Sequence, residues 1–140
     1  MKNKVVVVTG GSSGIGKALA LTYGIRGASI VFTGRNQNRM DEVSSELQEK
    51  SIDHLALTLD SASEEDNKSM IDQTIRKYGR LDVLICNAGI SMRALFEDVE
   101  IDVFKQVMDI NFYGTLYATK YALPHILETK GSIIGISSIN

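Results

Sequence analysis

Short runs of apolar residues, separated by longer stretches of mixed character, divide the chain at regular intervals. The first run, Val5–Thr9, is a continuous stretch of β-branched residues, which is typical of a strand buried on both faces of a sheet. Four later runs of similar length are interpreted as strands as well. We therefore expect five strands, at residues 5–9, 29–33, 54–59, 81–86 and 132–137.

The segment between the second and third expected strands has the pattern of an amphipathic helix. Met40, Val43 and Leu47 fall at i, i+3 and i+7, which places them on one apolar stripe. Asn36 precedes them as a residue suited to cap the helix N-terminus. The segment after the first strand is also helical in pattern and ends at about Arg26.

Two further helical regions follow the third and fourth expected strands. Ser63 and Asp66 match a capping-box pattern at the start of the first of them. The second spans roughly residues 101–127, and we expect Gly114 and Pro124 to interrupt it. Because strands alternate with helices throughout, the chain is predicted to form βαβ units with a parallel sheet and right-handed crossovers.

The composition is that of one soluble globular domain. The 140 residues are 44% hydrophobic and 23% charged, and the net charge of -2 favours neither nucleic acid nor a membrane as a partner. Cys86 is the single cysteine, so no intramolecular disulfide is expected. His54 and His125 lack companions at metal-ligand spacing, so no metal site is expected. We expect a cytoplasmic protein, because the first apolar run is too short for a signal peptide.

The stretch TGGSSGIG, residues 9–16, follows the first strand and opens a helix. Glycines in this context let the backbone turn tightly and approach a pyrophosphate, whose charge then faces a helix N-terminus. Ser12 and Ser13 add hydroxyl donors. The glycines are spaced G-x-x-x-G-x-G, which differs from the common G-x-G-x-x-G pattern. The stretch predicts a dinucleotide-binding turn.

Four motifs in this order resemble those of the short-chain dehydrogenase/reductase family. TGGSSGIG matches the glycine-rich turn, NAG at 87–89 follows the fourth strand, Asn111 lies in DINFYGT, and ISS at 136–138 ends the fifth strand. The resemblance covers the whole chain. It implies an α/β fold with a Rossmann-like doubly wound parallel sheet of order 3-2-1-4-5. It also implies that residues 1–140 form an NADP-binding domain that is truncated before later strands.

The same resemblance, together with the residue types, gives a set of expected cofactor contacts. These are Gly10, Ser12, Ser13, Gly14, Ile15, Gly16, Arg35, Asn36, Asp60, Ser61, Asn87, Ala88 and Gly89. Gly34 stands where NAD-preferring relatives carry an acid, and the guanidinium of Arg35 suits a phosphate, so we expect NADP(H). The alternative is that Arg35 is an ordinary solvated arginine. Asp60 is expected to contact the adenine amino group, to cap the next helix, or both.

Hydride transfer to a carbonyl needs a proton donor and a group that polarises the oxygen. The family resembled here uses asparagine, serine, tyrosine and lysine, in which the asparagine anchors a water and the serine holds the substrate oxygen. By motif position these are Asn111 and Ser138. The tyrosine and lysine would follow as Y-x-x-x-K, a spacing that does not occur in this sequence; Tyr117 and Lys120 are one residue too close and precede the serine.

The sequence leads to three alternative functions. The first is an NADP(H)-dependent oxidoreductase acting on a small-molecule carbonyl or secondary alcohol, of which this chain supplies the cofactor half and is inactive alone. The second is a nucleotide-binding fragment without turnover, and the third is an association module. The exposed apolar fifth strand favours a homo-oligomer or another partner that covers it. A methyltransferase is disfavoured, because an acid would be expected in place of Gly34 and Arg35.

Overall fold

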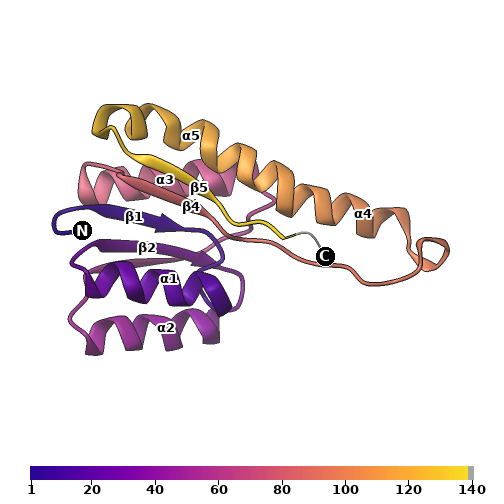
Figure 1. Ribbon diagram of the computed structural model, residues 1–140, viewed down its shortest axis with the longest axis horizontal. Helices are drawn as coiled ribbons and strands as arrows, with labels where there is room; N and C mark the ends of the chain where they lie inside the picture. The colour runs from indigo at the N-terminus through magenta and orange to yellow at the C-terminus, as the bar shows by residue number, and fades with distance from the viewer. Residues whose placement is uncertain (139–140) are drawn as a thin grey trace.

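The computed structural model, which describes residues 1–138, is built around a five-stranded sheet (Figure 1). The strands are β1 (Val5–Val8), β2 (Ser29–Gly34), β3 (His54–Thr58), β4 (Val83–Cys86) and β5 (Ser132–Gly135). Their order is β3-β2-β1-β4-β5, and all neighbouring pairs are parallel. The predicted doubly wound sheet of order 3-2-1-4-5 is therefore confirmed.

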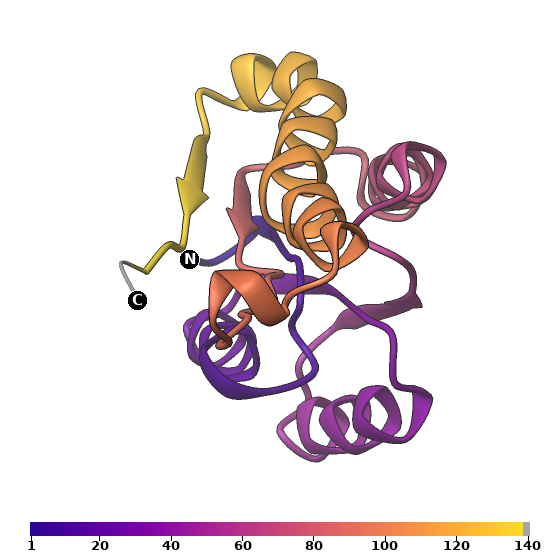
Figure 2. The ribbon, with the colours of Figure 1, turned by 90° about the vertical axis from the view of Figure 1, so that its right-hand side faces the viewer.

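Helices cover both faces of this sheet (Figures 1 and 2). The elements are α1 (Gly14–Ile25), α2 (Gln37–Glu49), α3 (Glu64–Tyr78), α4 (Ile101–Met108) and α5 (Gly114–Thr129). Helices α1 and α2 pack on one face, and α3 and α5 pack on the other. Helix α4 continues the line of α5 beyond the carboxyl edge of the sheet, and a short 3₁₀ turn (Phe96–Asp98) precedes it.

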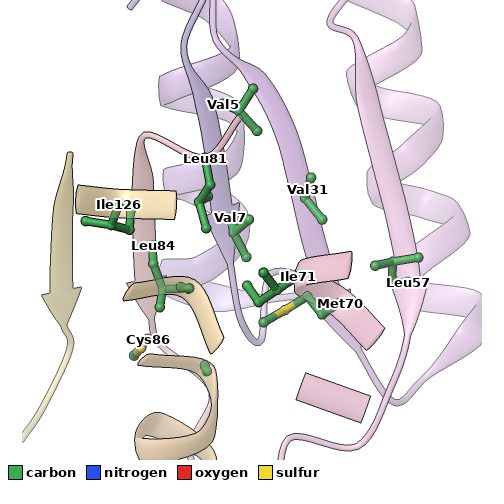
Figure 3. Packing of buried hydrophobic residues seen from close by; sticks show 12 residues of the cluster. Val5, Val7, Val31, Leu57, Met70, Ile71, Leu81, Leu84, Cys86 and Ile126 are labelled. Carbon is green, nitrogen blue, oxygen red and sulfur yellow. The ribbon is translucent and has the colours of Figure 1, made fainter. Parts of the chain in front are cut away.

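Strand β1 lies at the centre and contributes to the cores on both faces. Val5 and Val7 pack in the cluster that includes α3 and α5, whereas Val6 and Val8 pack in the cluster with α1 and α2. Successive side chains of a strand point to opposite faces, so a strand covered on both sides needs an unbroken apolar run. Figure 3 shows the first of these clusters, in which Met70 reaches the sheet from α3.

Asp82 ties together the amino ends of the central strands. Its side chain is 3% exposed and accepts hydrogen bonds from the Val5 N–H, from Lys4 and from Arg80. Its backbone carbonyl accepts from the Ser132 N–H, which starts β5. Burial raises the pKa of this carboxyl, but the hydrogen bonds from Arg80, Val5 and Lys4 outweigh it and lower the pKa to about 2.

The long helical region differs from the prediction. The break is a π-helical turn, Asp109–Tyr113, which connects α4 to α5 and ends before Gly114. Pro124 does not interrupt α5, although it lies inside the helix. Pro124 is exposed, so water can satisfy the carbonyl group that its missing N–H leaves without a donor. The expected interruption at Pro124 is therefore wrong.

Candidate functional site

The glycine-rich turn lies at the carboxyl end of β1 and continues into α1. Gly10 and Gly14 adopt φ values of 65° and 53°, a region that favours glycine. A Cβ atom at Gly10 would stand 2.8 Å from the Cα of Ala88, and one at Gly16 would collide with the Gly10 carbonyl. The turn is therefore packed against the loop after β4, and only glycine fits at these positions.

Hydrogen bonds hold this turn and the NAG motif together. The hydroxyl oxygen of Thr9 accepts from the N–H groups of Asn87 and Ala88, each at 3.0 Å. The side-chain amide of Asn87 donates to the carbonyls of Thr9 and Gly10 at 3.0 and 3.1 Å. The amide of Asn87 thus joins the ends of β1 and β4.

A cavity of about 440 Å³, here called the first cavity, lies over this turn at the carboxyl edge of the sheet. Every predicted cofactor-contacting residue lines it except Gly16, which is buried beneath the turn. The other lining residues were not predicted as contacts: Gly34, Arg39, Leu59, Ile90 and Ile110. A parallel sheet binds ligands at this edge, where the strand order reverses. The N-terminus of α1 also faces it, so the site suits an anion.

Arg35 and Arg39 give the first cavity a positive rim beyond the end of β2. Arg35 follows the strand, and Arg39 is the third residue of α2. The Asn36 side chain caps α2 by accepting from the Arg39 N–H at 3.0 Å, as the sequence predicted. Arg39 was missed because it belongs to no motif. The signal that could have found it is its position in the first turn of the helix after β2.

Asp60 lines the first cavity and also stabilises its own loop. Its Oδ1 atom accepts from the Ala62 N–H at 3.0 Å, and its N–H donates to the Asp66 carboxylate at 2.8 Å. The N-cap of α3 is Ser63, whose hydroxyl oxygen accepts from the Asp66 N–H. Capping of α3 is therefore the role of Ser63 and not of Asp60. Of the two hydrogen bonds of a capping box, the one from the Asp66 N–H to the Ser63 hydroxyl forms, whereas the Asp66 carboxylate accepts from the Asp60 N–H.

A second cavity of about 650 Å³ adjoins the first. The two share the wall formed by Ile15 and residues 87–90. The two predicted catalytic residues, Asn111 and Ser138, both line this second cavity, so the fold brings them together. Apolar walls come from Ile15, Ile90, Met92, Val107 and Ile136. No ionisable side chain is among the described residues that line it.

Asn111 occupies the π-helical turn, and its side chain is bonded to the loop after β4. Its Oδ1 atom accepts from the Ile90 N–H and its Nδ2 atom donates to the Ile90 carbonyl, both at 2.8 Å. The Thr115 hydroxyl donates to the Asn111 backbone carbonyl at 3.2 Å. The amide of Asn111 therefore positions the wall between the cavities, and its backbone carbonyl is the group that faces α5.

Ser138 follows β5, and its side chain is exposed. The strand ladder continues past β5 through the Ile136 N–H, which donates to the Cys86 carbonyl at 2.9 Å. This bond holds the chain that leads to Ser138 against the end of β4.

Among residues 1–138, no three histidine, cysteine, aspartate or glutamate side chains gather as metal ligands would. No helix in the same range is both long and apolar enough to cross a membrane.

Known proteins are similar to this chain in sequence. The family model for short chain dehydrogenases matches residues 4–140. An 11-beta-hydroxysteroid dehydrogenase A of Sesamum indicum is 41% identical over 137 residues, covering 96% of this chain and 39% of that protein. An 11-beta-hydroxysteroid dehydrogenase-like 3 of Arabidopsis thaliana is 42% identical over 139 residues, covering 96% of this chain and 44% of that protein.

Solved structures agree over nearly the whole chain. A double mutant of a Serratia marcescens short-chain dehydrogenase/reductase superposes with a TM-score of 0.93 and 30% identity, covering 98% of this chain and 56% of that one. An alcohol dehydrogenase of Thermococcus sibiricus complexed with 5-hydroxy-NADP superposes with a TM-score of 0.89 and 26% sequence identity. This match covers 94% of this chain and 57% of that one.

The match covers only part of each relative, although it is close within that part. The chain spans 39% to 44% of the two curated relatives and 56% to 57% of the two solved chains. Within that span the family model, the strand order and the glycine-rich turn all agree. On this evidence the chain belongs to the short-chain dehydrogenase family.

Proposed function

We propose that residues 1–140 form the cofactor-binding part of an NADP(H)-dependent oxidoreductase, which transfers a hydride between nicotinamide and a carbonyl or secondary alcohol. The observation that carries the proposal is the composition of the first cavity. It joins the glycine-rich turn and the α1 N-terminus to Arg35 and Arg39. The turn suits a pyrophosphate, and the two guanidinium groups suit a further phosphate.

NADP(H) is favoured over NAD(H) by charge at the end of β2. An acid there would bind the ribose hydroxyls of NAD, but Gly34 occupies the position and Arg35 follows it. Arg39 adds a second cation on the same rim. The Thermococcus sibiricus neighbour, which is complexed with 5-hydroxy-NADP, is consistent with this choice.

Each part of the site has a proposed role. The glycine-rich turn binds the pyrophosphate through backbone N–H groups, and Asp60 with Ser61 contacts the adenine. The bound cofactor supplies the hydride chemistry. Ser138 donates a hydrogen bond to the substrate oxygen, and Asn111 acts through Ile90 by fixing the wall between the two cavities.

The second cavity favours an uncharged substrate. Its apolar walls suit a hydrocarbon body, and the hydroxyls of Ser137 and Ser138 lie where a single oxygen would need a partner. The relatives described as 11-beta-hydroxysteroid dehydrogenases are consistent with an alcohol or ketone on an apolar skeleton. We propose a neutral secondary alcohol or carbonyl compound as the substrate class.

We further propose that the 140-residue chain binds NADPH without turnover and associates with itself in the cytoplasm. No Y-x-x-x-K spacing supplies an acid/base tyrosine within this sequence. Met108, Phe112, Leu116 and Leu123 are large, exposed apolar side chains on the α4–α5 region and offer a surface for a second copy. Analytical ultracentrifugation tests the association; a monomer at high concentration would contradict it.

Titration of the purified chain with NADPH and NADH, followed by nicotinamide fluorescence, tests the central proposal. Saturable binding with tighter affinity for NADPH is expected. Tighter binding of NADH would contradict the assignment of NADP(H). A chain that is folded by circular dichroism yet binds neither coenzyme would favour the association module instead.

A further inference from the structure

The buried side chain of Asn67, in the first turn of α3, holds the loop between β3 and α3. Asn67 is 4% exposed. Its Nδ2 atom donates to the Ser61 carbonyl at 2.9 Å and to the Ser63 carbonyl at 2.7 Å. These two bonds use both N–H groups of the amide. One side chain therefore fixes two peptide groups of a loop that belongs to no helix or strand.

The Ser61 carbonyl is also packed against α5. A Cβ atom added at Gly114, the buried first residue of α5, would stand 2.5 Å from this carbonyl oxygen. Between the loop and α3 there is a cavity of only about 10 Å³, which Ser61 and Asn67 both line. That is hardly the space of one water molecule. Direct contacts with Asn67 on one helix and Gly114 on the other therefore determine where Ser61 lies.

The same loop forms part of the wall of the first cavity. Asp60 and Ser61 both line this cavity, whereas Asn67 lines the small cavity beneath the loop. A carboxylate recognises an amino group through hydrogen bonds that weaken steeply with distance and angle. Because Asp60 and Ser61 share a peptide bond, a shift of the Ser61 backbone also moves the Asp60 carboxylate. Asn67 can thus affect a ligand in the first cavity through the loop alone.

We propose that Asn67 is a positioning residue for recognition of the adenine base. It acts by holding the Ser61 carbonyl against α5, which keeps the Asp60 carboxylate in the orientation that accepts from the adenine amino group. The inference rests on the proposed function, because it takes the first cavity to be the dinucleotide site. Loss of the Asn67 amide should weaken discrimination between bases, while the glycine-rich turn still binds the pyrophosphate.

Amide exchange tests the effect on the loop without any coenzyme. The Ala62 N–H donates to the Asp60 Oδ1 atom and the Ser63 N–H donates to the Asp60 carbonyl, each at 3.0 Å. Asn67→Leu keeps the volume but removes the donor, and it should speed exchange at these two N–H groups about tenfold, the value of one hydrogen bond. Unchanged exchange in Asn67→Leu would overturn the proposal.

Thr74→Val is the matched control for this experiment. Thr74 is fully buried on the same helix, and its hydroxyl donates to the Met70 carbonyl at 2.7 Å. The substitution also replaces a buried polar side chain of α3 with an apolar one, so it should lower Tm. Because Thr74 is remote from the loop, exchange at Ala62 and Ser63 should keep its wild-type rate.

Recognition of the base is tested by titration with NADPH and with its hypoxanthine analogue, which carries a carbonyl oxygen where adenine carries the amino group. The wild-type chain should prefer NADPH about tenfold, because the Asp60 carboxylate accepts from an amino group and is repelled by a carbonyl. In Asn67→Leu the two affinities should become nearly equal, whereas Thr74→Val should keep the preference. A merely structural role of Asn67 would weaken both coenzymes alike and leave their ratio unchanged.

Asn67→Asp is a second variant, which serves if Asn67→Leu does not fold. It keeps the shape of the side chain and places a carboxylate in the first turn of a helix, which the helix dipole favours. Its oxygens face the Ser61 and Ser63 carbonyls, so the preference for adenine should again be lost.

The outcomes separate this inference from the proposed function. If the wild-type chain binds NADPH and prefers adenine, but a folded Asn67 variant keeps that preference, the role of Asn67 is wrong and the proposed function stands. If the wild-type chain binds NADPH without preferring adenine, recognition of the base by Asp60 is wrong, and the role of Asn67 fails with it. If it binds neither coenzyme, the proposed function fails as well, while amide exchange still shows whether Asn67 holds the loop.

Discussion

The side-chain amide of Asn111 is paired with the backbone of Ile90 by two hydrogen bonds, one in each direction and both 2.8 Å long. The two residues come from distant segments, the π-helical turn between α4 and α5 and the loop after β4. An amide carries both a donor and an acceptor, so it can satisfy one backbone unit completely. Because Ile90 lines both cavities, this pair determines the position of their shared wall.

Loss of this pair is expected to loosen the loop after β4. Asn111→Ala removes both hydrogen bonds and should lower the free energy of unfolding by about 1–2 kcal/mol. Asn111→Asp keeps the acceptor for the Ile90 N–H but sets an oxygen against the Ile90 carbonyl. Urea unfolding and amide exchange at Ile90 measure both effects. Thr115→Val, which touches the same turn but not Ile90, is the control and should leave exchange at Ile90 slow.

The arginines on the rim of the first cavity should strengthen the binding of NADPH and not that of NADH. Arg35→Ala and Arg39→Ala are each expected to weaken NADPH binding about tenfold, which is the value of one charge-assisted contact. NADH binding should change little, since it lacks the extra phosphate. Arg26→Ala, at the opposite end of α1, is the charge-matched control. An equal loss for both coenzymes would show that the arginines act on something other than that phosphate.

Asp82 should make the fold sensitive to acid. Its folded-state pKa of about 2 lies below the ordinary aspartate value of 3.8, so its stabilising effect is present above pH 3.8 and is lost as the pH falls through 2. The difference corresponds to about 2 kcal/mol. Urea unfolding between pH 5 and pH 2 should lose roughly this much in the wild type, and Asp82→Asn should remove that part of the pH dependence.

The same substitution should also destabilise the chain at neutral pH, by about 2 kcal/mol, because Lys4, Arg80 and the Val5 N–H lose their charged hydrogen-bond acceptor. Asp72→Asn, on the exposed side of α3, is the control and should leave both the stability and its pH profile unchanged. A pH profile for Asp82→Asn that matched the wild type would contradict this account of Asp82.

Gly16 is expected to tolerate no side chain. Gly16→Ala would place a methyl group against the Gly10 carbonyl and the Asn87 amide, so the turn must shift. We expect the free energy of unfolding to fall by about 2–3 kcal/mol. NADPH binding should no longer be measurable. Gly135→Ala is the matched control, because its added Cβ atom would meet no atom within 4 Å. Wild-type affinity in Gly16→Ala would contradict the packing described here.

Much of the fold could be predicted because it depends on local patterns. The valines of β1 identify a strand covered on both faces, and Gly10 and Gly14 identify a turn with positive φ. Alternation of such strands with amphipathic segments leaves few topologies other than a parallel sheet. The end of α1 near Arg26 and the N-caps Asn36 and Ser63 follow from equally local signals.

What the pattern of residues could not decide depends on contacts between distant segments. Arg39 belongs to the first cavity only because α2 starts beside the glycine-rich turn, and Ser12 meets Gly34 only because that turn packs on β2. The break in the long helix is a π-helical turn at Asn111, whose amide bonds to Ile90, and not the expected break at Pro124. Sequence by itself determined the strands and the glycine-rich turn, since these arise from short-range periodicity and backbone freedom, and the strand order followed from the resemblance to the family. The tertiary structure decided which side chains share a cavity, because packing brings them together.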